Sequence, residues 1–386
     1  MKKETVCQIN KCVACNACVN ICPVGAIVID DSIKNCNAVI NSDKCIRCGA
    51  CKVVCQKHKL EGFVYPQKWK QGWTNDTDRE TSSSGGAVVS IAKAFIKNGG
   101  IACLCRFYEG KFNFGLVENC DELVNYVGSK YVKSDMEYIY GEINEKLKNG
   151  RKVLFVGLPC QVAGIKKFIN EKNKKNLYTM DLICHGTPSV KLLENYLNEQ
   201  GYSLNQVKKI YFRKKNLYHL YIQYADDKEI KKITHKGERD RYTMAFFKGL
   251  DYTENCYECD FARIERISDL TVGDSWGSTL DVQEQSKGIS LLLCQTKKGE
   301  ELIDLSDMNL LDVDLDKAKA ANQQLNYSVI KPNSRDKFFY MLDKNMKFSK
   351  AVGRCLPKLC IIQKVKKWLI RLGIWKLIDL IRRSRK

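Results

Sequence analysis

The chain has 386 residues, 20 cysteines and a formal net charge of +20. This length allows two or three domains with sizeable cores, and no stretch approaches the roughly 18 apolar residues of a membrane-spanning helix. The N-terminal sequence lacks an apolar secretion segment, so we expect a cytoplasmic protein whose clustered thiols bind metal. The basic residues are spread thinly, so we expect no nucleic-acid partner and interpret them as solvated faces or docking sites for acidic partners.

Residues 1–60 are predicted to form a ferredoxin domain. The spacing C-x2-C-x2-C-x3-C occurs at 12–22 and is repeated at 45–55. Structural zinc sites use separated cysteine pairs, whereas this spacing is typical of two 4Fe-4S clusters in which the last cysteine of each run binds the other cluster. The predicted ligand sets are Cys12, Cys15, Cys18 and Cys55, and Cys45, Cys48, Cys51 and Cys22. Between the runs, GAIVID and NAVIN predict two short strands.

Residues 61–80 are aromatic and polar, and we interpret them as a linker that lies on the next domain. Over 81–205, buried-strand patterns such as IACLCRF and KVLFVG alternate with helical patterns, which predicts an α/β half with a mostly parallel sheet. One predicted helix follows TSSSGG. Another is predicted to begin with Thr187 as its N-cap and Pro188 at its first position.

Residues 206–350 show a different pattern. VKKIYFRKK, YHLYIQYADD and EIKKITHKG predict successive antiparallel strands, and DLTVGDSWG and GISLLLCQT predict further core strands. The expected fold class is therefore mixed α+β and α/β. It combines a two-cluster ferredoxin fold, a flavin-binding core in two halves (81–205 and 206–350) and a basic amphipathic tail (351–386).

The tail is predicted to end in an amphipathic helix. Ile361, Val365, Trp368, Leu372 and Trp375 share one helical face, and lysine and arginine fill the other. Such a helix packs onto its own domain, lies on a membrane surface as a peripheral contact, or fills a groove of a partner protein. The pattern leaves these three alternatives open.

Four further cysteines lie in distinctive settings. Cys160 follows one predicted strand, Cys184 ends the next, and Cys256 and Cys259 form the pair CYEC. Sheets of α/β proteins bind ligands at the carboxyl ends of their strands. Two cysteines at adjacent strand ends and one C-x2-C pair are able to close a third 4Fe-4S site. The alternatives are a zinc site, or thiols that are reactive or structural.

The chain resembles the family that contains the beta subunits of coenzyme F420-reducing hydrogenase, together with F420H2 dehydrogenase input subunits and related flavin-dependent reductases. The motifs that carry the resemblance are SSSGG (82–86), GSKYVKS (128–134), GLPCQVAG (157–164), DLICHGTPS (181–189), YFRKK (211–215), CYECDFARIERISDLTVGDSWG (256–277) and GISLLL (288–293). The resemblance implies a core that binds FAD and its own 4Fe-4S cluster. The four core cysteines would be the ligands of that cluster.

The SSSGG motif is a candidate for holding the cofactor's pyrophosphate. The backbone amides of Ser83, Ser84, Gly85 and Gly86 precede a predicted helix, and a helix N-terminus attracts anions. The alternative is a flexible N-cap turn.

Three charged residues are further candidates for cofactor binding. Lys130 would place positive charge near the flavin or its phosphates, Arg213 would pair with an anionic coenzyme, and Asp274 would orient the flavin. Their alternatives are a surface lysine, a strand-end charge and a turn-forming aspartate. No residue is assigned as a general acid or base.

The leading hypothesis is an FAD- and iron–sulfur-dependent oxidoreductase. It would exchange electrons between a hydride carrier, such as coenzyme F420, and ferredoxin or another redox partner. One alternative is an electron-transfer protein of a larger complex, without a substrate of its own. Another is a ferredoxin-dependent flavin reductase that acts on an organic substrate.

Overall fold

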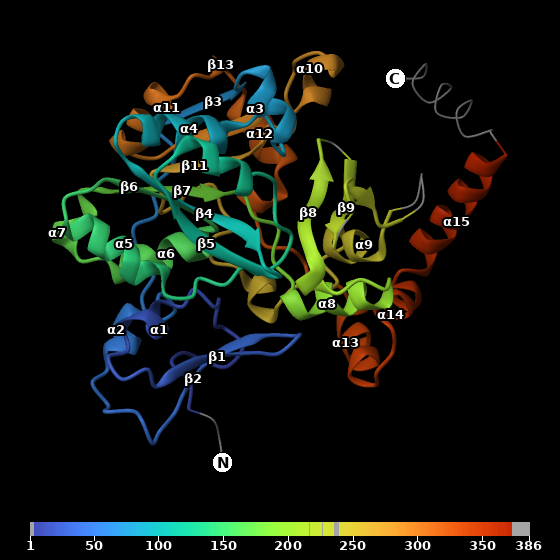
Figure 1. The fold of residues 1–386 in the computed structure, drawn as a ribbon, viewed down its shortest axis with the longest axis horizontal. Coiled ribbons are helices and arrows are strands. Elements are labelled where there is room, and N and C mark those ends of the chain that lie inside the picture. Colours follow the sequence, from blue (N-terminus) through green and yellow to red (C-terminus); the bar gives the residue numbers. More distant parts are fainter. Residues whose placement is uncertain (1–3, 216, 226, 235–238, 373–386) are drawn as a thin grey trace.

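The computed structural model describes residues 4–215, 217–225, 227–234 and 239–372. An N-terminal module, a large central sheet and a smaller sheet with its own helices make up this part of the chain (Figure 1). The helices are α1 (Ala17–Ile21), α2 (Ala50–Val54), α3 (Asp76–Thr81), α4 (Ala87–Lys97), α5 (Ile139–Lys148), α6 (Pro159–Phe168), α7 (Glu171–Lys174), α8 (Val190–Glu199), α9 (Arg241–Phe247), α10 (Val282–Lys287), α11 (Lys297–Leu305), α12 (Leu315–Ala321), α13 (Arg335–Asp343), α14 (Phe348–Cys355) and α15 (Pro357–Arg371).

The module contains the two strands predicted within it. They form the antiparallel hairpin of β1 (Ile27–Asp31) and β2 (Cys36–Ile40). Each cysteine run continues into a short helix, α1 or α2, and these two helices pack against each other. This arrangement is ferredoxin-like and brings the two runs together.

The central sheet has eight strands in the order β13–β3–β12–β11–β7–β6–β4–β5. Their bounds are β3 (Lys68–Trp73), β4 (Ile101–Tyr108), β5 (Lys111–Val117), β6 (Val153–Gly157), β7 (Leu177–Leu182), β11 (Leu270–Asp274), β12 (Ser290–Cys294) and β13 (Asn309–Leu311). Strands β4, β6, β7 and β11 run parallel, whereas the flanking pairs are antiparallel. The predicted parallel sheet is therefore only the centre of a mixed sheet, and residues from both predicted halves build it.

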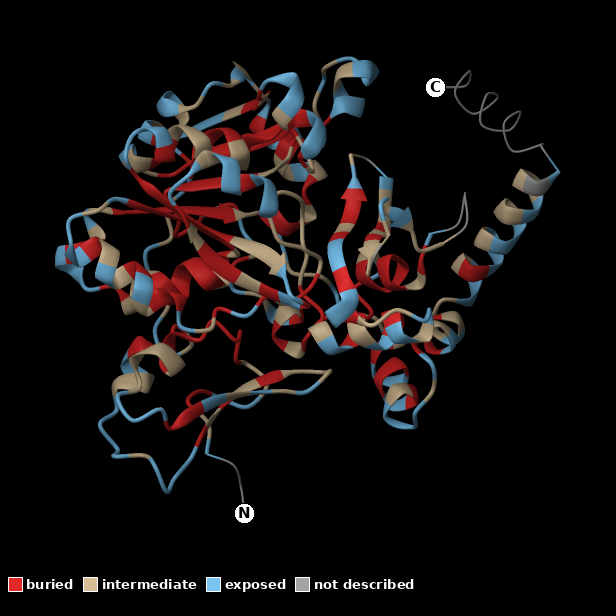
Figure 2. Ribbon diagram, in the orientation of Figure 1, coloured by how far each residue is buried: buried red, intermediate tan, exposed pale blue. Residues whose placement is uncertain are grey.

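The central strands feed two separate apolar cores, because successive side chains of a strand point to opposite faces. On β6, Leu154 and Val156 face the core under α4 and α11, whereas Val153 and Phe155 face the core under α5 and α6. Figure 2 shows the middle of the sheet buried along its length. Parallel strands that are covered on both faces are typical of α/β cores.

The N-terminal module packs against α5 and α6. Ala17 of α1 and Val162 of α6 belong to the same apolar cluster. A polar contact adds to it: the Asn16 side-chain amide donates to Asp135 Oδ1 at 2.9 Å. The module and the core are thus joined through one continuous buried contact.

Helix α6 makes the tightest part of this contact at Gly164. A Cβ atom at Gly164 would lie 3.1 Å from the sulfur of Cys15 and 2.8 Å from the Tyr140 hydroxyl oxygen. Only a residue without a side chain fits there without displacing a neighbour. Cys160 lies one helical turn earlier, on the same face of α6.

Residues 61–80 are not the linker that their composition predicts. Residues 68–73 form β3, which lies between β12 and β13 in the central sheet. Gly72 permits this position, since a Cβ there would lie 2.2 Å from the Asn309 carbonyl oxygen. The first residues of β3 are exposed near the sheet edge, so a polar sequence is compatible with a strand.

Helix α8 begins later than predicted. Ser189, not Thr187, is its N-cap, and the Ser189 hydroxyl oxygen accepts from the backbone N–H of Lys191 at 3.3 Å. The preceding segment is extended because tertiary partners hold it. The Pro188 carbonyl accepts from the Lys133 backbone N–H at 2.8 Å, and the Thr187 carbonyl accepts from the Thr253 backbone N–H at 3.1 Å.

The antiparallel strands predicted beyond residue 205 form a separate small sheet. Its strands are β8 (Val207–Lys214), β9 (Leu217–Tyr224) and β10 (Lys231–Lys232), in the order β10–β9–β8. The predicted strands DLTVGDSWG and GISLLLCQT instead enter the central sheet as β11 and β12.

Helix α15 extends away from the core (Figure 1), and its apolar residues are exposed. Ile361 is 59 % exposed, Val365 50 % and Trp368 61 %, so this face does not pack onto the protein's own domain. Trp375 and the rest of the predicted tail helix lie outside the described residues. None of the described helices combines the length and the apolar character needed to cross a membrane.

The α6 contact predicts opposite effects for two glycine substitutions. Gly164→Ala should lower the free energy of unfolding by about 1–3 kcal/mol, because the added methyl group overpacks against Cys15. Gly353→Ala should raise it by about 0.5–1 kcal/mol, because this α14 position has open space and alanine favours helix. Chemical denaturation measures both values. Equal effects of the two substitutions would contradict the tight packing at Gly164.

Candidate functional site

The structure brings the first predicted ligand set together within the N-terminal module. Cys12, Cys15, Cys18 and Cys55 line one small cavity, which we call the inner site. Cys12, Cys15 and Cys18 are buried. Burial raises the pKa of Cys15 to about 11, whereas a hydrogen bond from Cys7 lowers the pKa of Cys55 to about 6. Cys7, which the spacing does not single out, therefore lies against the inner site and favours the thiolate form of Cys55.

The second set occupies the exposed end of the module, which we call the outer site. Cys51 is close enough to Cys45 and Cys22 for all three to interact electrostatically. Cys48 is exposed in the loop between them. The left-handed backbone at Arg47 (φ 57°) turns this loop. The outer site thus lies at the surface and the inner site against the core.

The core cysteines come from three elements and meet in a second cavity, the core site. Cys160 lies at the start of α6, Cys184 follows β7, and Cys256 and Cys259 lie at the turn before β11. All four line the same cavity. The sequence predicts this assembly only as one alternative, because the elements are far apart along the chain.

Each of the three sites offers four cysteines, and four cysteines are the donor set that a 4Fe-4S cluster takes. Within the described ranges, no group of three ligand side chains is close enough to hold one ion. At the core site, burial raises the pKa of Cys184 to about 12 and of Cys259 to about 11. A bound cationic metal core would stabilise these thiolates.

The core site also touches the N-terminal module. Val13 and Lys57 of the module line the same cavity as Cys160 and Cys256. The Gln56 side-chain amide donates to the Cys160 carbonyl oxygen at 2.6 Å. The inner and core sites are therefore separated only by the residues of this contact.

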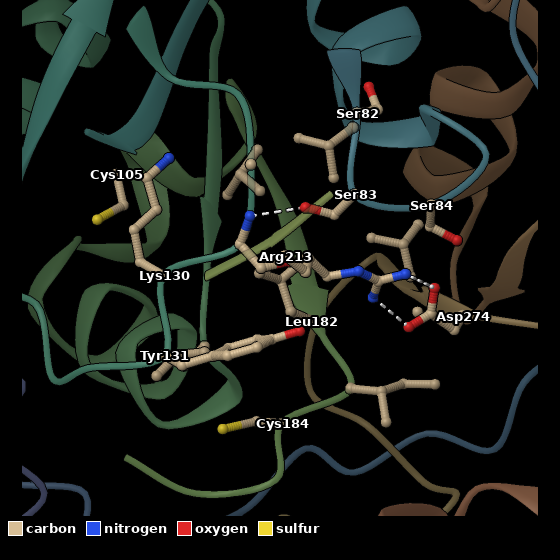
Figure 3. A pocket seen from close by; sticks show the side chains of 18 of the residues that line it. Ser82, Ser83, Ser84, Cys105, Lys130, Tyr131, Leu182, Cys184, Arg213 and Asp274 are labelled. Atoms are coloured by element: carbon tan, nitrogen blue, oxygen red, sulfur yellow. Dashed lines mark hydrogen bonds and ion pairs between the residues drawn. The ribbon is translucent and has the colours of Figure 1, made fainter. Parts of the chain in front are cut away.

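A larger cavity of about 270 Å³ opens on the other side of the core site. Its volume lies just below the range, about 300–1,000 Å³, that is typical of small-molecule and cofactor sites. Leu158, Cys184, His185, Gly186 and Thr187 line both this cavity and the core site. We call the larger cavity the cofactor cavity; Figure 3 shows 18 of its lining residues.

Most of the predicted cofactor-binding residues line this cavity. They are Ser83, Ser84, Gly86, Lys130, Arg213 and Asp274. Ser83 is fixed by the Ser129 backbone N–H, which donates to its hydroxyl oxygen at 2.7 Å (Figure 3). Gly86 is the N-cap of α4, so the first turn of that helix opens into the cavity.

Gly85 does not line the cavity, although the sequence groups it with its neighbours. A Cβ at Gly85 would lie 2.3 Å from the Gly72 carbonyl oxygen and 2.6 Å from the Ser290 backbone nitrogen. The residue therefore allows β3 and β12 to approach the start of α4. Its role in the structure is packing.

Arg213 and Asp274 bind each other across the mouth of the cavity. Arg213 Nη1 lies 2.7 Å from Asp274 Oδ2, and Nη2 lies 3.3 Å from Oδ1 (Figure 3). The Arg213 side chain is almost fully buried, and the nearby Asp274 carboxylate raises the pKa of the guanidinium against the effect of burial. The pair joins β8 of the small sheet to β11 of the central sheet. The sequence predicts both residues but not their pairing.

Lys130 lies on the opposite wall from this pair (Figure 3). Its ammonium donates to the carbonyl oxygens of Tyr126 at 2.7 Å and Val127 at 3.1 Å. Burial lowers its pKa to about 8. Lys130 thus offers a positive charge that an anionic ligand would stabilise.

Several residues of the cavity wall are not identified by the sequence. Tyr131 stacks on Phe246, with ring centroids 4.5 Å apart, and points towards Arg213 (Figure 3). Gln161 is buried, and its side-chain amide donates a hydrogen bond to the Ser134 hydroxyl oxygen at 3.1 Å. Tyr131 belongs to GSKYVKS and Gln161 to GLPCQVAG, so the motifs locate them, but only tertiary packing shows what they contact.

His185 lies between the cofactor cavity and the core site. Its Nδ1 pairs with the Gln324 side-chain amide at 2.8 Å, and its ring lies 5.9 Å from that of Trp276. Burial lowers its pKa. These contacts fix the ring in the wall that the two cavities share.

Two family models match the chain. Residues 150–316 match the model that describes the C terminus of the coenzyme F420 hydrogenase/dehydrogenase beta subunit. Residues 11–59 match the 4Fe-4S dicluster domain. The first match includes all four core cysteines and the second includes both cysteine runs.

Two curated proteins are similar to the chain. Coenzyme F420-dependent sulfite reductase of Methanocaldococcus jannaschii is 23 % identical over 322 residues, which are 75 % of this chain and 45 % of that protein. The F component of the F(420)H(2) dehydrogenase of Methanosarcina mazei is 22 % identical over 195 residues, which are 47 % of this chain and 56 % of that protein. The chain thus spans about half the length of these relatives.

A solved structure is also similar, though distantly. It is a chain of the F420-reducing [NiFe] hydrogenase complex from Methanosarcina barkeri, in a xenon derivative. The TM-score is 0.45 and the identity 18 %, over 68 % of this chain and 90 % of that chain.

Lys130 predicts a pH dependence of stability in the cofactor-free protein. Its pKa is about 8 in the folded chain, against 10.5 ordinarily, so between these values the unfolded chain binds more protons and the free energy of unfolding rises with pH. The rise is at most about 3 kcal/mol, because the cavity is open to solvent. Lys130→Met should be more stable than wild type below pH 8, and this advantage should disappear towards pH 10.5.

Denaturation of both proteins under anaerobic, reducing conditions measures this difference. Lys97→Met, on the exposed end of α4, is the control and should show no such pH dependence. A stability difference for Lys130→Met that stays constant from pH 7 to 10.5 would contradict the lowered pKa.

Proposed function

Because the chain belongs, through residues 150–316, to the family of coenzyme F420 hydrogenase/dehydrogenase beta subunits, we propose that it passes electrons between a hydride carrier and its iron–sulfur clusters through FAD. The dicluster domain over 11–59 makes it an iron–sulfur protein of an oxidoreductase family. Beyond the two clusters of this domain, we propose that the chain binds FAD and a third 4Fe-4S cluster, with a direct electron-transfer route between them.

One observation carries the proposal: the three cavities are contiguous. The cofactor cavity and the core site share the wall around Cys184 and His185. The core site in turn shares Val13 and Lys57 with the module that contains the inner site. At the outer site Cys48 is exposed, whereas Cys22, Cys45 and Cys51 are half-buried. This order supports a route from a hydride-accepting cofactor to the surface.

The residues of the cofactor cavity offer groups that suit FAD. The first turn of α4 lines the cavity, and its first N–H groups have no partner within the helix, which would suit a pyrophosphate. The Ala87 N–H donates to Ser290 Oγ at 3.5 Å. Lys130 adds a positive charge to the wall. Tyr131, Phe246 and Trp276 supply flat apolar surfaces for a ring system. Bound FAD would supply the exchange of a hydride for two single electrons.

The chain itself positions these groups. The ion pair of Arg213 and Asp274 closes one side of the cavity and neutralises both charges there. Stacking on Phe246 fixes the Tyr131 ring. The Gln324 side chain fixes the His185 ring in the wall towards the core site. No proton transfer by a side chain is required for hydride transfer, and none is assigned.

At the core site, the proposed ligands are Cys160, Cys184, Cys256 and Cys259. All four thiols face one cavity, and buried Arg266 lies near Cys184 and Cys259 and lowers their pKa against the effect of burial. Buried thiolates require such compensation or a metal. The set is therefore better suited to a cluster than to free thiols.

The names of the relatives support coenzyme F420 as the hydride carrier. Both curated relatives are described by their use of this coenzyme. The partner that receives or supplies single electrons would dock at the outer site, where Cys48 is exposed. Ferredoxin is one such partner.

The match lengths favour a second candidate function. This chain covers only 45 % of the sulfite reductase and 56 % of the dehydrogenase component. A chain that corresponds to the electron-input part of a larger enzyme would feed a separate catalytic unit. Membrane or partner contact through α15 stays a prediction, and the exposed Trp368 and Val365 are the surface that would make it.

Removal of one core cysteine should interrupt electron transfer between the flavin and the clusters of the N-terminal module, while both of these cofactor sites stay intact. Cys256→Ser should lose about four irons per chain and keep the dicluster sites. A hydride donor such as reduced F420 should still bleach the flavin, but reduction of the remaining clusters should be more than tenfold slower. Iron analysis and rapid-mixing absorbance measure these changes. Cys120→Ser, which lies outside all three sites, is the control. An unchanged iron content in Cys256→Ser would contradict the proposed core ligands.

Blocking the cofactor cavity should abolish flavin binding. Val88 lies in the first turn of α4 and lines the cavity, so Val88→Trp fills space that the cofactor needs. The affinity for FAD, measured by fluorescence titration, should fall more than tenfold. Val124→Trp, at a surface position that is 64 % exposed, should leave the affinity unchanged. Equal affinities for both variants would place the flavin elsewhere.

A further inference from the structure

The segment 132–137, just before α5, is one of the parts of the core that contact the N-terminal module. Asn16 donates to Asp135, and the Asn20 side-chain amide donates to the Glu137 carbonyl oxygen at 2.8 Å. The same segment is anchored to the core, because the Lys133 backbone N–H donates to the Pro188 carbonyl at 2.8 Å. The segment therefore lies between the two bodies and is fixed on both sides.

Lys133 directs its side chain into the space between the inner and core sites. It lines the core site together with Cys160 and Cys256 on one side and Val13 of the module on the other. Val13 follows Cys12, a ligand of the inner site, directly in the chain. Cys12 of the inner site and Cys160 and Cys256 of the core site are close enough to interact electrostatically with the Lys133 ammonium.

The other cations of this region are arranged differently. Lys57, which lines the same cavity, forms an ion pair with Asp260, so its charge is compensated. Arg266 lines the core site and interacts with Cys184 and Cys259. Lys57 lines the inner site as well, but Asp260 compensates its charge. Lys133 interacts with cysteines of both sites and is not the lysine that pairs with Asp260.

We propose that Lys133 is a positioning charge that makes the core and inner clusters easier to reduce and lowers the repulsion between them. Each 4Fe-4S cluster with four thiolates carries a net charge of about −2, which becomes about −3 on one-electron reduction. In a buried contact such charges are poorly screened, so a cation between them stabilises the reduced forms. The outer cluster lies beyond the inner one, at the exposed end, and should be affected least. This inference rests on the core cluster of the proposed function.

The test is a redox titration of the anaerobically purified full chain, followed by electron paramagnetic resonance. Wild type should show three one-electron waves. In Lys133→Met, which removes the charge and keeps most of the side-chain length, two waves should move to lower potential. A shift of at least tenfold in each reduction equilibrium, which is 59 mV for one electron, is expected. The third wave should stay within a factor of two.

Three further variants make the result specific. Lys133→Arg keeps the charge and should restore both potentials. Lys133→Gln is a second neutral variant, in case Lys133→Met loses iron. Lys358→Met neutralises an exposed lysine of α15, a helix on the opposite side of the molecule from α1 and α2 (Figure 1), and should change nothing.

The outcomes separate this inference from the proposed function. Three results would overturn the role of Lys133. The first is wild-type potentials in both neutral variants, and the second is an equal shift of all three waves. The third is a shift in Lys133→Arg that is as large as the shift in Lys133→Met. Failure of the proposed function would be visible in wild type instead, as about eight irons per chain and only two waves.

Discussion

The close approach of Gly164 to Cys15 is the contact on which the arrangement of the cofactor sites depends. Helix α6 carries Cys160 at its start and Gly164 one turn later on the same face. One face of one helix therefore carries a cysteine of the core site and receives the loop of the inner site. Because a helix is stiff, the separation between the two sites is set by its backbone and not by flexible side chains.

Burial of charge is the second constraint, and it follows from the first. Bringing two sets of thiolates to one dry contact concentrates negative charge where water cannot screen it. The structure places Lys133 and Arg266 there, and it pairs Lys57 with Asp260 at the rim. The apolar cluster that joins the module to α5 and α6 supplies the free energy that holds these charges together.

The sequence predicts those features of the fold that depend on the spacing of residues along the chain. The two cysteine runs predict the module, and strand–helix alternation predicts the parallel centre of the sheet. It fails where tertiary pairing decides the outcome. The segment around β3 has the composition of a linker, yet Gly72 fits it against β13. The N-cap of α8 moves from Thr187 to Ser189 because Pro188 pairs with another segment.

The same limit applies to the sites. The spacing predicts the ligands of the inner and outer sites, whereas the core set depends on three separate elements and is only one alternative in the sequence. Gly85 belongs to the same motif as the residues that line the cofactor cavity, but it packs against β3 and β12 instead. Lys133 falls within GSKYVKS, so the motif locates it, but its position between two sites arises only when the module docks.

The most direct test is anomalous diffraction at the iron edge from crystals of the anaerobically purified protein. The predicted result is three peaks of iron density in a row, with the core peak between Cys160 and Cys256 and next to the cofactor cavity. Only two peaks, both within residues 4–60, would contradict a continuous route and would leave the core cysteines without a cluster.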